Sequence, residues 1–132
     1  MSWVDSLSRI LYQIPERPTS VQMEVNNACN LNCVMCPRHD LPIELQEMNL
    51  EVFKTSIDAL SKLGLKHVDI GGWGEVTYHK DFVEIIRYAA RKGLKISMTT
   101  NGLLLRKERL QVLLDEGVKN LTFSIDSLEK RK

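Results

Sequence analysis

The sequence has little net charge, no long apolar run and few cysteines, and each shortage argues against a class of protein. The formal net charge is +1 over 132 residues, so no excess of one sign points to nucleic acid or a membrane surface as a partner. No apolar run approaches the length that crosses a bilayer. Residues 1–5 lack the basic start of a signal peptide, and no long apolar core follows them. We therefore expect a cytoplasmic protein.

The three cysteines, Cys29, Cys33 and Cys36, are confined to one short stretch of the chain. A disulfide framework would spread an even number of cysteines along the sequence. Three thiols in one loop predict instead metal ligation or redox chemistry in a reducing compartment. The hydrophobic fraction of 43% and the charged fraction of 27% are ordinary for a folded soluble domain. The length suits one compact domain.

Strand-like and helix-like segments alternate along the chain. The predicted helix over residues 50–63 has Asn49 as its N-cap, and Gly64 and Gly93 are expected to end helices. Asp81 and Glu84 have the spacing of a capping box. The predicted strands cover residues 21–26, 67–70, 95–99 and 121–125, and the predicted helices cover residues 2–13, 50–63, 81–92 and 106–116.

This alternation predicts an α/β fold with a parallel sheet. Ligands of such sheets bind at the carboxyl ends of the strands. The unusual polar and glycine-rich segments all follow predicted strands, at residues 29–36, 71–75, 99–102 and 124–126. Four parallel strands cannot close a barrel, and the last would remain an exposed edge. We therefore expect either a truncated barrel or a partner that covers this edge.

The cysteine spacing, C-x3-C-x2-C, has a chemical consequence. Iron–sulfur cubanes are usually held by four thiolates, one on each iron. Three thiolates leave one iron open, and an open iron can bind a ligand and pass it an electron at contact distance. Reductive cleavage of a sulfonium needs this combination.

The loop resembles the signature of the radical S-adenosylmethionine (radical SAM) superfamily. The glycine-rich run Gly71-Gly72-Trp73-Gly74-Glu75 resembles that family's motif after the second strand, and Thr100-Asn101-Gly102 resembles its segment after the third. The resemblance implies a partial (β/α)6 TIM-like barrel over residues 19–132, truncated after the fourth strand. An N-terminal helix and linker over residues 1–18 would precede it.

The resemblance also implies cofactors and site residues. Cys29, Cys33 and Cys36 would ligate a [4Fe–4S] cluster, and SAM would chelate its open iron and yield a 5′-deoxyadenosyl radical. An external donor such as flavodoxin or ferredoxin would supply the electron. A carboxylate facing an ammonium group suits Glu75 for the SAM amino group. The further residues expected to bind SAM are Gly72, Gly74, Asn101, Ser124, Asp126 and Met35.

Two departures and the choice of branch bear on these expectations. Met35 stands where many relatives carry an aromatic residue near the adenine, and methionine can pack there as a soft apolar contact. Val76 stands where proline often follows the glutamate. The loop also resembles the SPASM-type peptide-modifying branch and the molybdenum-cofactor cyclase branch. The substrate class is therefore left open between a peptide and a small molecule.

Other readings of the same residues remain open from the sequence. The three cysteines with His39 are formally a Cys3His zinc site in an interaction module. The chain could also be a catalytically incomplete fragment that holds a cluster without using SAM productively. Glu75 alone would be a solvated loop acid, Asn101 a turn residue before Gly102, and Asp126 a helix cap.

Overall fold

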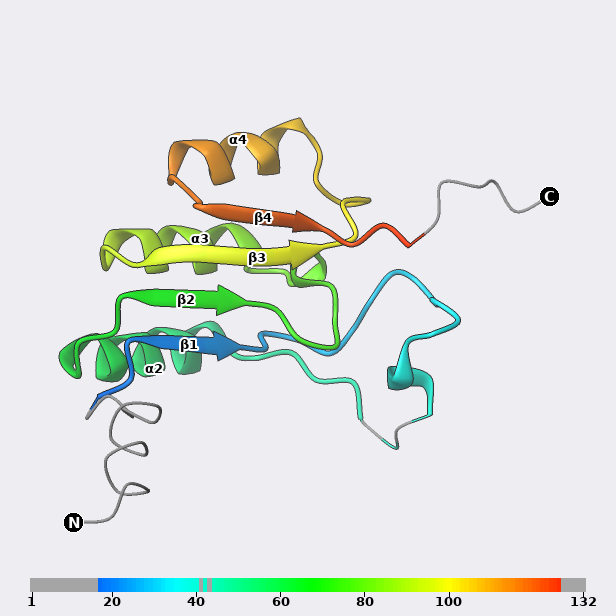
Figure 1. Ribbon diagram of the computed structural model, residues 1–132, viewed down its shortest axis with the longest axis horizontal. Coiled ribbons are helices and arrows are strands. Elements are labelled where there is room, and N and C mark those ends of the chain that lie inside the picture. Colours follow the sequence, from blue (N-terminus) through cyan, green and yellow to red (C-terminus); the bar gives the residue numbers. More distant parts are fainter. Residues whose placement is uncertain (1–16, 41, 43, 127–132) are drawn as a thin grey trace, which may run out of the picture.

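The computed structural model describes residues 17–40, 42 and 44–126, so the helix predicted over residues 2–13 lies outside the described part. Four strands form one parallel sheet in chain order, and their carboxyl ends point to the same edge (Figure 1). This confirms the predicted parallel α/β fold. The strands are β1 (Ser20–Met23), β2 (His67–Ile70), β3 (Lys95–Thr100) and β4 (Asn120–Phe123).

Three helices follow the first three strands. They are α2 (Leu50–Lys62), α3 (Phe82–Arg91) and α4 (Lys107–Asp115), and two short 3₁₀ helices lie in the loops, η1 (Pro37–His39) and η2 (Val76–Tyr78). Alternate strand residues such as Val68, Ile70, Ile96 and Met98 join helix residues such as Phe53 in a single buried core. The α-helices therefore pack on one face of the sheet. None of the described helices is long and apolar enough to cross a bilayer.

The ends of the helices follow local chemistry, with one correction. The Asn49 side chain accepts a hydrogen bond from Glu51 N at 2.8 Å, as predicted for an N-cap. Gly93, with φ +71°, follows the C-cap of α3 in a conformation that glycine adopts without strain. The predicted capping box at Asp81 is wrong. Its backbone has φ −94° and ψ 20°, away from the extended geometry of an N-cap, and its side chain caps nothing.

The strand predicted over residues 21–26 ends early, at Met23. Its partner β2 stops before the glycine-rich segment, and Gly71 N donates to Met23 O at 3.1 Å just past the paired residues. Beyond this point Asn26 pairs with Glu47 in an isolated antiparallel bridge. Met48 N also donates to Val25 O at 2.7 Å. These bonds close the base of the long loop that carries the cysteines.

The face of the sheet away from the helices is polar. In register across the four strands lie Gln22, Asp69, Ser97 and Asn120. Ser97 Oγ accepts from Asn120 Nδ2 at 3.1 Å and lies 2.7 Å from His67 Nε2. Because strand residues alternate between faces, the same backbone supplies an apolar core on one side and a hydrophilic surface on the other.

Candidate active site at the carboxyl edge of the sheet

The cysteine loop leaves β1 at the carboxyl edge of the sheet and extends beyond it before α2 begins (Figure 1). Cys29, Cys33 and Cys36 are free thiols, each partly exposed. Cys36 N donates to Cys33 O at 3.0 Å, which forms a turn between the second and third cysteines. Arg38 Nη2 donates to Leu31 O at 3.1 Å and ties the end of the loop back to its beginning.

The cysteine loop is docked directly on the glycine-rich segment. Glu75 N donates to Ala28 O at 2.8 Å, and Asn26 Nδ2 donates to Glu75 O at 3.1 Å. A Cβ atom on Gly74 would lie 2.3 Å from Asn26 O, which no side chain tolerates. Gly74 therefore allows the two segments to approach each other. The sequence predicted only a contact with SAM for this glycine.

Glu75 is buried, with 3% of its surface exposed, so the interpretation as a solvated loop acid is wrong. Its Oε1 accepts from Thr77 N at 3.0 Å, from the Thr77 hydroxyl and from Thr100 Oγ1 at 2.6 Å. Its Oε2 accepts from Asn101 N at 2.7 Å. Three of these donors therefore fall on Oε1 and one on Oε2. The carboxylate thus fastens the end of β3 to the glycine-rich segment.

Asn101 reaches the cysteine loop from the end of β3. Its Nδ2 lies 2.9 Å from Asn30 Oδ1 and 3.8 Å from Cys29 Sγ. Its Oδ1 accepts from Leu103 N at 3.0 Å, so the turn interpretation of this asparagine is also confirmed. The structure therefore brings together three predicted site segments, the cysteines, Glu75 and Asn101.

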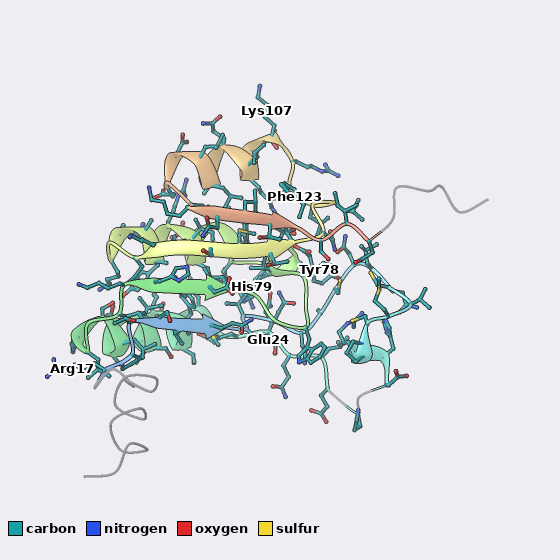
Figure 2. All side chains as sticks on the ribbon, in the orientation of Figure 1. Arg17, Glu24, Tyr78, His79, Lys107 and Phe123 are labelled. Atoms are coloured by element: carbon teal, nitrogen blue, oxygen red, sulfur yellow. The ribbon has the colours of Figure 1, made fainter. Side chains whose placement is uncertain are left out.

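A second carboxylate, which sequence reasoning did not single out, lies at this edge. Glu24 lines a pocket of about 490 Å³ together with Gln22, Gly71, Gly72 and Trp73. Its Oε1 accepts from Trp73 N at 2.5 Å, and a Cβ atom on Gly72 would lie 2.4 Å from the same oxygen. Figure 2 shows Glu24 just beyond the end of β1. The sequence around Glu24 contains no signal for this pocket.

Comparison with known proteins identifies the family. The model of the Radical SAM superfamily matches residues 23–132. The chain belongs to the radical SAM superfamily. Members of this superfamily use a [4Fe–4S] cluster and SAM.

Radical SAM relatives and solved structures agree with this assignment. The chain is 33% identical over 116 residues to the PqqA peptide cyclase of Rhodopseudomonas palustris, covering 85% of this chain and 30% of that protein. It is 32% identical over 114 residues to the GTP 3′,8-cyclase of Chlorobaculum tepidum, covering 85% of this chain and 34% of that protein. The chain thus spans about a third of the length of these relatives.

The crystal structure of BtrN in complex with AdoMet and 2-DOIA superposes with a TM-score of 0.75 at 25% identity, covering 86% of this chain and 48% of BtrN. This similarity confirms the predicted partial radical SAM barrel.

The donor set suits the cluster of a radical SAM protein. Cys29 Sγ accepts from Leu31 N at 3.4 Å in addition to Asn101 Nδ2, and such N–H donors stabilise a thiolate. Within the described ranges, no three His, Cys, Asp or Glu side chains are placed to hold a single metal ion. Cluster thiolates each bind a different iron and so stand farther apart than the ligands of one zinc. The Cys3His zinc site stays the alternative that metal analysis decides.

His79 and Glu47 hold the base of the cysteine loop against the next βα unit, and sequence reasoning assigned neither a role. His79 is fully buried; its Nε2 lies 2.9 Å from Met48 O, and its Nδ1 accepts from Asp81 N at 2.9 Å. A carbonyl only accepts and a backbone N–H only donates, which assigns the proton to Nε2. The Lys80 backbone N–H, donating to Glu47 Oε1 at 2.8 Å, lowers the pKa of Glu47.

The other predicted residues lie at the same edge, on the surface. Ser124 and Asp126 follow β4 and are exposed, and Ser124 N donates to Thr100 O at 2.9 Å. Met35 is exposed in the cysteine loop. Their contacts with SAM stay predictions.

Proposed function

We propose that the protein is a radical SAM enzyme whose cluster is held by Cys29, Cys33 and Cys36. The observation that carries this proposal is the docking of a loop with three free thiols on the glycine-rich segment that ends in Glu75. When bound, the cluster supplies an open iron and an electron, and SAM supplies the 5′-deoxyadenosyl radical that removes hydrogen from a substrate. The chain's own residues supply position and charge.

The pocket beside Glu24 suits the amino group of SAM. Its carboxylate lies at the surface of the pocket, whereas that of Glu75 is buried and surrounded by protein donors. We assign the ammonium contact to Glu24 with the backbone around Gly72 and Gly74. Glu75 then acts as a positioning residue for Asn101 and the end of β3. The alternative is that Glu75 contacts the SAM ammonium group, as first predicted from the sequence. The variants Glu24→Gln and Glu75→Gln distinguish the two assignments.

The substrate is a peptide or a small molecule. The names of two relatives, PqqA peptide cyclase and GTP 3′,8-cyclase, support both classes. The polar face of the sheet supports a hydrophilic substrate. We expect an external electron donor such as flavodoxin or ferredoxin, a cytoplasmic location, and neither nucleic acid nor a membrane as partner.

The test is anaerobic reconstitution with iron and sulfide, followed by dithionite and SAM. We expect a brown protein with labile sulfide that forms 5′-deoxyadenosine, and Cys33→Ala should abolish both. A protein that holds a cluster but forms no 5′-deoxyadenosine is the incomplete fragment. Stoichiometric zinc, with no capacity for iron after reconstitution, would overturn the cluster itself.

A further inference from the structure

We propose that Asn101 is a positioning residue for the cluster, because its side-chain amide donates a hydrogen bond to the sulfur of Cys29. This inference rests on the proposed function, since it requires that Cys29 be a cluster ligand. It assigns Asn101 to the cluster, rather than to SAM. The consequence is that Asn101 raises the reduction potential of the cluster.

Hydrogen bonds of its backbone N–H and of its side-chain oxygen fix the orientation of Asn101. Its backbone N–H donates to the buried Glu75 carboxylate at 2.7 Å, and its Oδ1 accepts from Leu103 N at 3.0 Å. Because Oδ1 is occupied by a backbone donor, the amide NH2 must face the other way. There it meets Asn30 Oδ1 at 2.9 Å and Cys29 Sγ at 3.8 Å.

Cys29 differs from the other two cysteines in this respect. Among the described residues, hydrogen bonds to a cysteine sulfur fall on Cys29, from Leu31 N at 3.4 Å and from Asn101 Nδ2. Donors to a cluster sulfur stabilise the reduced state more than the oxidised state, because the reduced cluster carries one more negative charge. The step is a one-electron reduction by an external donor in which no bond or proton moves.

Two variants remove the donor while keeping the turn. In Asn101→Asp an oxygen still accepts from Leu103 N, but the second oxygen replaces the NH2 group and adds charge. In Asn101→Ser the hydroxyl can keep the turn without added charge, and it is too short to reach Cys29. Asn32→Ala is the control, because Asn32 is an exposed asparagine of the same loop.

The measurement is the midpoint potential of the reconstituted cluster without SAM. Electron paramagnetic resonance monitors the reduced cluster during a titration with dithionite. We expect both Asn101 variants to be harder to reduce by about tenfold in the equilibrium constant, which is about 59 mV for one electron. Asn32→Ala should keep the wild-type potential. The cluster-free Asn101 variants could also melt at the temperature of the cluster-free wild type but fail to take up the cluster. That result would also support the positioning role of Asn101.

Two results separate the failure of this inference from that of the proposed function. If the wild type takes up no iron and sulfide, the proposed function fails. If wild type and both Asn101 variants load equally and share one potential, the cluster assignment stands and the role of Asn101 is overturned.

Discussion

At the scale of single residues, two glutamates at one edge of the sheet differ in environment. Glu24 lies in a pocket, while Glu75 is buried among four donors. We expect Glu24→Gln to weaken SAM binding to the reconstituted protein by about tenfold or more, because a hydrogen bond to a charged group contributes roughly 1.5–3 kcal/mol. Titration of the cluster's spectrum with SAM gives the dissociation constant.

Glu75→Gln should act on stability instead. It places an NH2 group opposite backbone and hydroxyl donors, so the free energy of unfolding should fall by about 2–4 kcal/mol. Urea unfolding of both variants without cluster measures this. A Glu75→Gln protein of wild-type stability that no longer binds SAM, beside a Glu24→Gln protein that binds it normally, would return the ammonium contact to Glu75.

His79 provides a second test at this scale. His79→Phe fills the space but leaves Met48 O and Asp81 N without their partners in the interior, so we expect a loss of about 2–4 kcal/mol in the free energy of unfolding. Tyr78→Phe, at the exposed neighbouring position, should change it little. Equal stability of the two variants in urea unfolding would show that His79 does not hold the loop.

The sequence identified some of these residues and missed others for a physical reason. The cysteines, the glycines and Glu75 form short patterns in adjacent positions, so their residue types alone indicate chemistry. Glu24 and His79 acquire their roles through contacts with segments about fifty and thirty residues away in the chain. Their own neighbours in the sequence contain no trace of those contacts.

At the scale of elements, the central contact is the cysteine loop against the glycine-rich segment. Gly74→Ala should push these apart, because its Cβ atom would meet backbone oxygens of Asn26 and Ala28 at 2.3 and 2.7 Å. We expect a lower melting temperature and weaker cluster loading. Gly71→Ala is the matched control for melting, since its Cβ atom would have Thr99 N at 4.0 Å as its nearest neighbour. Equal melting of the two variants would contradict the docking.

The base of the cysteine loop should respond to acid through Glu47. Its pKa is lowered from its ordinary value of 4.5, first by the hydrogen bond from the Lys80 backbone N–H and further by the Lys80 side chain, although burial of the carboxylate acts in the opposite direction. A lowered pKa in the folded state stabilises the protein above about pH 4.5, and this contribution is lost as the pH falls through the lower value. Glu47→Gln should therefore flatten the acid limb of a plot of stability against pH. If the acid limb of Glu47→Gln matches that of the wild type, Glu47 does not make the stability depend on pH.

Element positions were predictable because hydrophobic periodicity sets them, and every described strand and α-helix overlaps its prediction, whereas the two short 3₁₀ helices were not predicted. The ends of the elements were less predictable. The strand expected through residue 26 stops at Met23 because its neighbour turns away at the glycines, a tertiary event that alternation in one segment does not encode.

At the scale of the whole molecule, one sheet separates an apolar core from a hydrophilic face. The row Gln22, Asp69, Ser97 and Asn120 crosses all four strands on the side without described helices. In a barrel of the radical SAM type this side faces inward. The fold therefore places polar groups beneath the edge that carries the cysteines and the pocket, as expected for the hydrophilic substrate proposed above.

We propose that three thiolates hold a cluster whose open iron binds SAM. The most direct measurement is the electron paramagnetic resonance spectrum of the reconstituted, dithionite-reduced protein, recorded with and without SAM. An open iron that binds SAM predicts a reduced-cluster signal whose shape and position change when SAM is added, and no such signal from Cys33→Ala. A cluster signal that SAM leaves unchanged would contradict it.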